Sequence, residues 1–332
     1  MLDLTTTYMG IKLKNPIIAS SSGLTNALSD IIDLEANGVA AIVLKSLFEE
    51  EIIMETQDNL NRMQASGFIY PETIEYFDFD EMGDPVADYL KLISDAKSEV
   101  KIPIIASINC ITADKWPDFA KRIQEAGADG LELNIFSLSS DPGRTALENE
   151  QVYFDVIEKV TKLVTIPVSI KLSPYNASLS NLIKRLGETP IKAIVLFNRY
   201  YRPDFDIHNF EFTTTNVLSS SAEMALPLRW IAIMADRINC DLAASTGIHN
   251  GEGVVKQLLA GAIAVQVCST LYRNGLGQIQ IMLNDVQEWM GEKGFKKIDD
   301  FRGKMSQVRS YNPAAFERVQ FMQFFKEKGK PY

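Results

Sequence analysis

The stretch GADGLELNIFSLSSDPG, from Gly127 to Gly143, carries the pattern that decides the fold. A helix is expected to end at Gly127, and a short apolar strand then runs through Leu131 and Leu133. The strand delivers Asn134 into a loop that holds Ser137, Ser139 and Ser140. A polar amide at the carboxyl end of a buried strand, followed by a hydroxyl-rich loop, is typical of the catalytic end of a (β/α) barrel.

The same alternation of strand and helix extends along the whole chain. Apolar runs of strand length cover residues 16–20, 41–46, 103–109, 130–135, 167–172, 193–198, 242–246 and 264–268. Helical patterns lie between them at residues 28–37, 84–98, 114–126, 149–163, 178–187, 222–238 and 251–260. The strands are apolar throughout, as parallel strands buried on both faces are. Eight such units predict an α/β fold of the closed (β/α)8 type, the TIM barrel.

The flanking segments predict additions to one barrel domain rather than further domains. Residues 1–332 are interpreted as a single domain, with a barrel core at about 14–275 and extra helices at about 276–328, because barrels of this length often form one domain. The opening YMGIKLKNP, Tyr8 to Pro16, is expected to form a hairpin that closes the lower end of the barrel. The connections Leu47–Gly83 and Asn198–Ser221 are long enough to be lids or binding loops.

Composition narrows the class of protein. The chain has 43 acidic and 33 basic residues and a net charge of −10, which argues against nucleic acid and against a polybasic membrane patch. Three scattered cysteines give neither a disulfide framework nor a metal-binding spacing. No apolar run approaches the roughly 18 residues of a membrane span, and no secretory signal is recognisable. We therefore expect a soluble cytoplasmic protein, with no metal, that acts on a small molecule.

Polar side chains end five of the predicted strands in succession. These residues are Lys45, Asn109, Asn134, Lys171 and Asn198. Burying such groups in a barrel mouth costs several kcal/mol unless each is paired, roughly 2–7 kcal/mol for an amide. A ring of them therefore predicts a polar ligand.

Small residues end the first strand and the last two. The seventh strand ends in Ser245-Thr246-Gly247-Ile248 and the eighth in Cys268-Ser269-Thr270. Loops after these strands are the usual phosphate site of such barrels, where open backbone N–H groups meet a helix start. The first strand ends in Ala19 and Ser20 and is followed by Gly23, and small residues there would let a flat ring approach the backbone.

The order of these motifs resembles one family. NPIIASSSG, LKS, ASIN, GADGLELNI, VSIKLSP, FN, STGI and AGAIAVQVCST follow one another as in the dihydroorotate dehydrogenase family of FMN-dependent TIM barrels. The resemblance spans roughly residues 3–275 and marks the chain as a divergent member. It implies an FMN flavoprotein oxidoreductase that oxidises dihydroorotate to orotate in pyrimidine biosynthesis.

The resemblance also implies roles for individual residues. FMN would be held by Ala19, Ser20, Gly23, Lys45, Ser46, Asn109, Asn134, Lys171, Thr246, Gly247, Cys268 and Ser269. Substrate would be held by Asn134, Asn198 and Arg199. The base that takes a proton from substrate would be Ser137, three residues after Asn134, where the family has cysteine or serine. Serine needs a dry, positioned site or a water relay for that role.

The substrate half of the pattern departs from the family. The proline and second asparagine that usually follow the base are absent, and only Asn134 and Asn198 remain of four substrate-gripping asparagines. Unpaired polar groups on the usual substrate would cost affinity, so the sequence leaves the identity of the substrate undecided. The alternatives are an FMN barrel that acts on another cyclic or enone substrate, a non-catalytic FMN-binding protein, and an aldolase-like barrel with Lys171 as Schiff-base lysine. The electron acceptor is unassigned, and a homodimer is kept as a candidate assembly.

Overall fold

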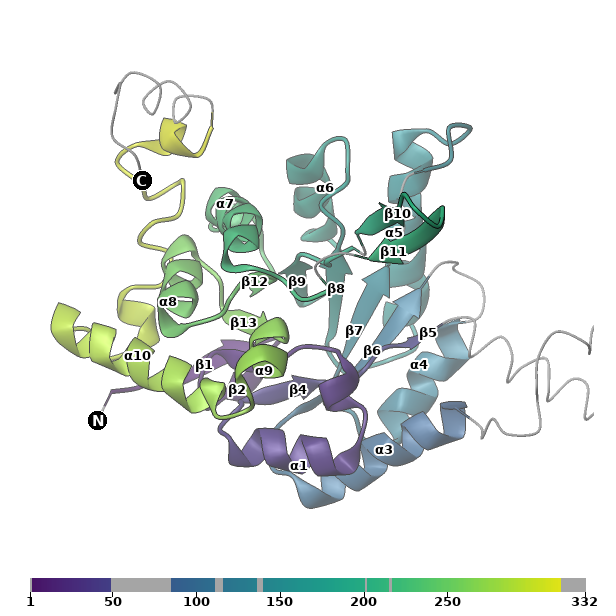
Figure 1. Cartoon of the computed structure of the whole chain (residues 1–332), viewed down its shortest axis with the longest axis horizontal. Helices are drawn as coiled ribbons and strands as arrows, with labels where there is room; N and C mark the ends of the chain where they lie inside the picture. The colour runs from purple at the N-terminus through teal and green to yellow at the C-terminus, as the bar shows by residue number, and fades with distance from the viewer. Residues whose placement is uncertain are drawn as a thin grey trace, which may run out of the picture.

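A closed barrel of parallel strands forms the centre of the molecule (Figure 1). The computed structural model describes residues 2–48, 85–110, 116–135, 140–200, 202–214 and 217–317, and the structural statements below concern these residues. The barrel strands are β3 (Ile17–Ala19), β4 (Ala41–Val43), β6 (Ile104–Cys110), β7 (Gly130–Ile135), β8 (Val168–Leu172), β9 (Ala193–Leu196), β12 (Asp241–Ser245) and β13 (Ala264–Val267). Each pairs with its neighbour, and β4 pairs with β6 to close the ring. The predicted TIM barrel is confirmed.

Helices follow the strands and surround them. They are α1 (Leu28–Ala36), α3 (Pro85–Glu99), α4 (Trp116–Glu125), α5 (Ala146–Thr161), α6 (Leu179–Leu186), α7 (Ala225–Met234) and α8 (Gly251–Ala260). Each overlaps a helix that the sequence predicts. A short helix, α9 (Ser269–Asn274), directly follows β13, and the turns η1 (Gly23–Thr25) and η3 (Ser221–Met224) precede α1 and α7.

Strand side chains alternate between two buried sets. Ile17, Leu131 and Ile194 belong to the set that packs against the surrounding helices. Ile18 and Val195, one position further along their strands, belong to the set that packs with the N-terminal hairpin. Both faces of each strand are thus buried, which explains the unbroken apolar runs in the sequence.

The N-terminal hairpin lies at the amino end of the barrel strands. It consists of β1 (Thr6–Tyr8) and β2 (Ile11–Leu13), paired antiparallel. The Met9 N–H donates to Asp241 Oδ2 at 2.7 Å, at the first residue of β12. Burial raises the pKa of Asp241, and this hydrogen bond opposes the shift. The predicted hairpin is present, and it leaves the carboxyl ends of the strands open for a site.

Other additions lie outside the barrel. The helix α10 (Gln278–Lys293) packs closely on α8, because a Cβ built on Gly251 would lie 2.2 Å from the Asp285 Cβ. Short turns η4 (Ile298–Asp300) and η5 (Pro313–Phe316) follow, so residues 276–317 form one long helix and two turns. The rest of the predicted helical extension, after residue 317, lies outside the described residues.

The two long connections are described to different extents. The connection after β9 contains a hairpin of β10 (Pro203–Asp206) and β11 (Glu211–Thr214). Its Phe205 and Phe212 rings lie 5.3 Å apart, and both side chains are exposed. The connection after β4 begins with β5 (Leu47–Phe48), and its residues 49–84 lie outside the described residues.

Candidate functional site

A cavity of about 540 Å³ opens at the carboxyl ends of the barrel strands. It is lined from six strands or the loops that follow them, by residues that include Ser20, Asn134, Lys171, Asn198, Arg199, Thr246, Gly247, Gln266, Cys268 and Ser269. Nine of these ten residues are among those that the sequence singles out as site residues. Gln266, which lies within a strand, and Ser219, from the loop before α7, also line the cavity and were not predicted.

Two asparagine side chains meet at the cavity wall. Asn134 lies on β7, and Asn198 follows β9 by two residues. The Asn198 Nδ2 group donates a hydrogen bond to Asn134 Oδ1. Both residues are only partly buried, and each amide keeps further donor or acceptor capacity. The pair can therefore orient a ring that carries carbonyl and N–H groups.

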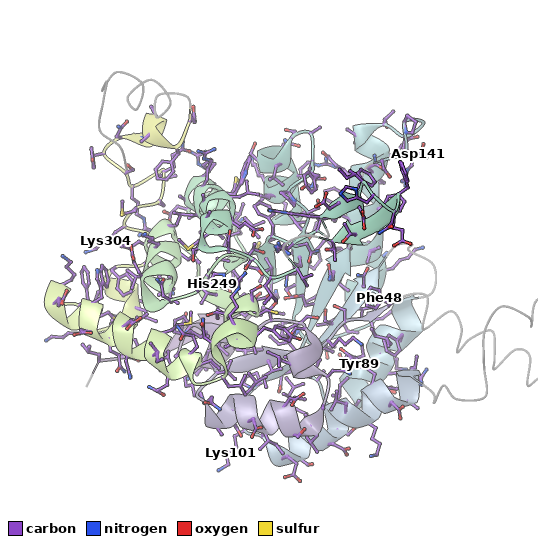
Figure 2. The ribbon with its side chains drawn as sticks, viewed as in Figure 1. Phe48, Tyr89, Lys101, Asp141, His249 and Lys304 are labelled. Carbon is purple, nitrogen blue, oxygen red and sulfur yellow. The ribbon has the colours of Figure 1, made fainter. Side chains whose placement is uncertain are left out.

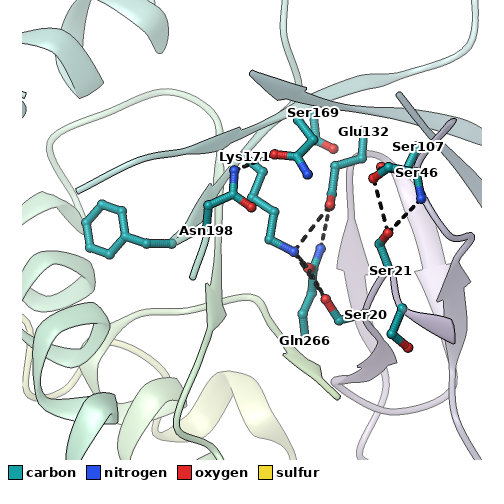
Figure 3. Close-up of polar contacts among 12 residues, drawn as sticks. Ser20, Ser21, Ser46, Ser107, Glu132, Ser169, Lys171, Asn198 and Gln266 are labelled. Carbon is teal, nitrogen blue, oxygen red and sulfur yellow. Dashed lines mark hydrogen bonds and ion pairs between the residues drawn. The ribbon is translucent and has the colours of Figure 1, made fainter. Parts of the chain in front are cut away.

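Lys171 is the buried cation of the cavity floor (Figure 3). Its Nζ group donates to Gln266 Oε1 at 2.8 Å and to Ser20 Oγ at 3.1 Å. It also lies 3.5 Å from Glu132 Oε1, and both side chains are less than a tenth exposed. A fixed positive charge in a dry site is suited to stabilise negative charge that develops on a ligand.

Ser46 and Lys45 do not join this cavity. The Ser46 N–H donates to Ser21 Oγ at 2.9 Å, and its hydroxyl lies 2.8 Å from the Ser107 hydroxyl (Figure 3). Lys45 is exposed and lines a separate cavity of about 460 Å³ together with Ser46 and Tyr89. The hydroxyl of Tyr89, on α3, donates to the Ser107 carbonyl at 3.0 Å, so Tyr89 lies beside β6 (Figure 2). The described residues therefore bring Lys171, but not Lys45, to the main cavity.

The loops after β9, β12 and β13 meet at the other end of the cavity. The Ser219 N–H donates to Ser269 Oγ at 3.0 Å, and the Gly247 N–H points to Ser219 Oγ at 3.4 Å. Ser219 Oγ also lies 3.2 Å from His249 Nε2. Burial is the largest cause that lowers the pKa of His249, and it favours the neutral form of this imidazole.

Both the backbone conformation and the close packing at position 247, where these loops meet, require a glycine. Its φ is +79°, and a Cβ there would lie 2.2 Å from the Met224 backbone nitrogen. Backbone and hydroxyl groups are therefore held close together beside the cavity. Cys268 lines the same end, and burial raises the pKa of its thiol, so the thiol is protonated at neutral pH.

Arg199 reaches the cavity wall already paired. Its Nε group donates to Glu223 Oε2 at 2.9 Å, and its Nη1 group donates to the Val217 carbonyl at 2.7 Å. Arg202 contacts the same carboxylate oxygen at 2.8 Å. Burial tends to raise the pKa of Glu223, but its hydrogen bonds from Arg199 and the Ser220 N–H hold that pKa below its usual value. Much of the Arg199 charge is therefore compensated within the protein.

The remaining predicted site residues that the structure describes are not among those that line the cavity. Ala19 is the buried last residue of β3, and the following Ser20 N–H donates to the Val267 carbonyl at 2.9 Å. Gly23 lies under Tyr272, because a Cβ there would be 2.7 Å from the Tyr272 hydroxyl. Asn109 is buried on β6, opposite Asn134 in the strand register. Ser137 lies outside the described residues.

The residues of the cavity fit FMN, the cofactor that the resemblance implies. The cavity has a cation and amides at one end for the polar edge of a flavin ring. At the other end it has hydroxyls and the loops that follow the last two barrel strands, which is where the phosphate sites of these barrels lie. Its volume lies within the usual 300–1,000 Å³ of cofactor pockets.

Two kinds of feature are absent from the described part of the chain. No group of three or more histidine, cysteine or acidic side chains is arranged to hold a metal ion there. None of the helices within it is both long enough and apolar enough to cross a membrane.

Comparison with known proteins gives a consistent group of relatives. A family model described as dihydroorotate dehydrogenase matches residues 3–290. The catalytic subunits of dihydroorotate dehydrogenase B (NAD(+)) from Thermoplasma acidophilum and Thermoplasma volcanium are each 27% identical over 91% of this chain, and the matches cover 99% and 98% of those proteins. The NAD-dependent dihydropyrimidine dehydrogenase subunit PreA of Escherichia coli K12 is 24% identical over 91% of this chain and 76% of that protein.

Proposed function

Because the chain belongs to the dihydroorotate dehydrogenase family, we propose that it oxidises dihydroorotate to orotate with FMN as the first electron acceptor. Proteins of this family are FMN oxidoreductases that act on CH–CH donors. The substrate, the site residues and a role in pyrimidine biosynthesis are our proposal. So are the cytoplasmic location and the assignment of the chain to a single domain.

One observation carries the proposal. The cavity at the carboxyl ends of the strands combines the Lys171 cation with the facing amides of Asn134 and Asn198. A cyclic imide such as dihydroorotate presents alternating carbonyl and N–H groups, which paired amides can recognise by complementary hydrogen bonds. The cation is suited to the negative charge that a reduced flavin gains.

We propose the following roles for the protein's own residues in binding FMN and substrate and in proton transfer. Bound FMN supplies the group that accepts hydride from substrate. Asn134 and Asn198 orient the substrate ring, and Lys171 with Ser20 holds the polar edge of the cofactor. Thr246, Gly247, Cys268 and Ser269 hold the phosphate. Ser137 receives the proton that leaves the neighbouring carbon, and this assignment rests on its sequence position after Asn134.

The proposal is tested by cofactor content and single-turnover reduction. The purified chain should carry FMN, or take it up in a one-to-one ratio, and turn yellow. Anaerobic mixing with dihydroorotate should then bleach the flavin, and the orotate formed should equal the flavin reduced. A colourless chain that takes up no FMN would refute the flavin site, whereas a yellow chain that dihydroorotate never bleaches would refute only the substrate.

A second substrate class is favoured by the state of Arg199. An arginine that receives the carboxylate of dihydroorotate should have its donors available, but Nε and Nη1 are directed to Glu223 and Val217. A neutral ring such as dihydrouracil needs no such cation. The relative named as a dihydropyrimidine dehydrogenase subunit is in keeping with this alternative. Faster bleaching by dihydrouracil than by dihydroorotate under the same conditions would establish it.

A protein partner is proposed as the final electron acceptor. Two of the relatives are named as catalytic subunits and a third as a subunit, so those proteins work in assemblies. We propose that this chain likewise passes electrons from FMN to a second subunit. Purification from the native source should then recover a second polypeptide with the yellow chain, and recovery of the chain alone, with full turnover, would exclude the partner.

A further inference from the structure

A carboxylate lies beneath the cation of the proposed flavin site. Glu132, on β7, is 1% exposed and is not among the residues that line the cavity. Its Oε2 atom accepts a hydrogen bond of 2.5 Å from Gln266 Nε2. Its Oε1 atom has no hydrogen-bond partner among the described residues and lies 3.5 Å from Lys171 Nζ. Because an isolated buried charge is very costly, the lysine is what compensates this carboxylate.

Gln266 joins the two charges into one unit (Figure 3). Its amide nitrogen donates to Glu132, and its amide oxygen accepts from Lys171 at 2.8 Å. With the contact of 3.1 Å to Ser20 Oγ, the ammonium group has three oxygen atoms around it. Ser20, Lys171 and Gln266 line the cavity, so the unit extends from its wall into the barrel interior.

No other described group balances the carboxylate. Lys171 is the only cation of the described ranges within ion-pair distance of Glu132. Two buried phenols, Tyr8 and Tyr89, have raised pKa values, mainly through burial, and the negative charge of Glu132 contributes to both shifts. They are therefore neutral at ordinary pH. The pair of Glu132 and Lys171 thus brings almost no net charge to the cavity, although Lys171 alone would bring one positive charge.

We propose that Glu132 is a positioning residue that acts as the counter-ion of Lys171 and sets how strongly the site favours reduced over oxidised FMN. The inference rests on the proposed flavin site. Reduction adds negative charge to the flavin ring, and a lysine nearby stabilises that charge. A carboxylate behind the lysine reduces this stabilisation, because the two charges act on the ring with opposite sign.

The test is the substitution Glu132→Gln, which removes the charge and nearly preserves the shape. The measured quantity is the dissociation constant of oxidised FMN divided by that of reduced FMN. This ratio should rise by about tenfold, because the lysine then stabilises the reduced flavin with no opposing carboxylate. For a two-electron couple, a tenfold change equals a rise of about 30 mV in the midpoint potential. Spectroelectrochemical titration of the holoprotein measures it directly, and fluorescence titration gives the affinity for oxidised FMN.

Three further variants make the result specific. Glu132→Asp keeps the charge and should leave the ratio of the two dissociation constants within about threefold of its value in the original protein. Glu150→Gln removes the carboxylate of a different, only partly buried ion pair, which Glu150 on α5 forms with Arg185 on α6 at 2.9 Å. It should leave the potential unchanged. Glu132→Met also removes the charge, with a side chain of similar size that needs no hydrogen-bond partner, and should raise the ratio as well; it tests the same idea should Glu132→Gln fail to fold.

The outcomes separate the two proposals. An unchanged or lowered ratio in Glu132→Gln, or in Glu132→Met, would overturn the role of Glu132 while leaving the flavin site intact. A wild-type chain that binds no FMN would overturn the flavin site itself.

Discussion

Gly247 and Gly275 share a left-handed backbone but differ in their surroundings. Their φ angles are +79° and +76°, yet a Cβ on Gly247 would lie 2.2 Å from the Met224 nitrogen, whereas nothing lies within 4 Å of one on Gly275. Gly247→Ala should therefore add a clash to the conformational strain of about 1–3 kcal/mol that both substitutions carry. We expect FMN affinity to fall by about tenfold or more in Gly247→Ala, which fluorescence titration measures.

Gly275→Ala is the matched control. It has a positive φ as well but no clash, and it lies at the end of α9, so it should leave the FMN dissociation constant within about twofold, a change of less than half a kcal/mol. Equal affinities in the two variants would mean that the close approach of the loops at Gly247 plays no part in binding the cofactor.

Ser137 is the residue on which the proposed chemistry depends. Replacing it with alanine should slow anaerobic flavin reduction by substrate by about 10²–10⁴-fold, the usual contribution of a positioned general base. FMN content should stay the same, because Ser137 is proposed to contact substrate. The neighbouring variant Ser139→Ala should reduce the flavin at close to the normal rate, and a normal rate in Ser137→Ala would remove its assignment as the base.

Residues inside the strands were harder to foresee than those at strand ends. Lys171, Asn134 and Asn198 were predicted because a polar group that ends an apolar run is conspicuous, and all three line the cavity. Glu132 and Gln266 lie within the apolar runs GLELNI and AVQVC. A charged or amide residue in a doubly buried strand was the available signal, since such groups are costly to bury unpaired.

At the scale of elements, exposure explains which strands the sequence predicted. The eight barrel strands are buried on both faces and leave long apolar runs. The hairpin of β10 and β11 is almost wholly exposed and reads PDFD and EFTT, so it has no such run. The start of α5 was predicted three residues late, because the capping box of Thr145 and Glu148 sets it at Ala146.

Glu223 fixes the loop that follows β9 to the turn η3. Its carboxylate accepts from Arg199, Arg202 and the Ser220 N–H. Glu223→Gln should lower the free energy of unfolding by about 1–3 kcal/mol, because charge-assisted hydrogen bonds are lost. Hydrogen exchange should increase around Arg199 at the same time. Glu158→Gln, in an exposed pair with Lys162, should cost less than about 1 kcal/mol.

The ion pair of Glu223 and Arg199 predicts how the stability of the fold changes with pH. The pKa of Glu223 is lowered in the folded chain, so its contribution to stability is complete above the usual glutamate pKa and is lost as the pH falls through the lowered value. Chemical denaturation between neutral and acidic pH should therefore show a smaller acid-induced loss of stability in Glu223→Gln than in the original chain. Identical pH profiles would show that the pair contributes nothing to folding.

At the scale of the whole molecule, the cofactor should act as a stabilising ligand. A ligand that binds only the folded chain at a hundred times its dissociation constant adds about 2.7 kcal/mol to the free energy of unfolding. FMN should therefore raise the melting temperature with increasing concentration. Riboflavin, which lacks the phosphate, should raise it less, because the end of the cavity around Gly247 and Ser269 would be left without its anion. Equal shifts would contradict the phosphate assignment.

The architecture could be predicted almost completely, and the substrate could not. The order of eight apolar runs gives the closed barrel, and the proposed phosphate end was placed by its position on the last two strands. Substrate recognition depends on side chains such as Arg199, whose partner Glu223 lies 24 residues further along the chain. Pairings of that kind arise only when the loops fold together, so the sequence pattern alone cannot reveal them.

The central claim is that this barrel uses FMN to oxidise dihydroorotate. Anaerobic titration of the FMN-loaded chain with dihydroorotate tests it most directly, with flavin absorbance and orotate followed together. We predict stoichiometric loss of the yellow colour, with one orotate formed for each flavin reduced. A flavin that stays oxidised with excess dihydroorotate, yet is bleached by chemical reductant, would contradict the claim.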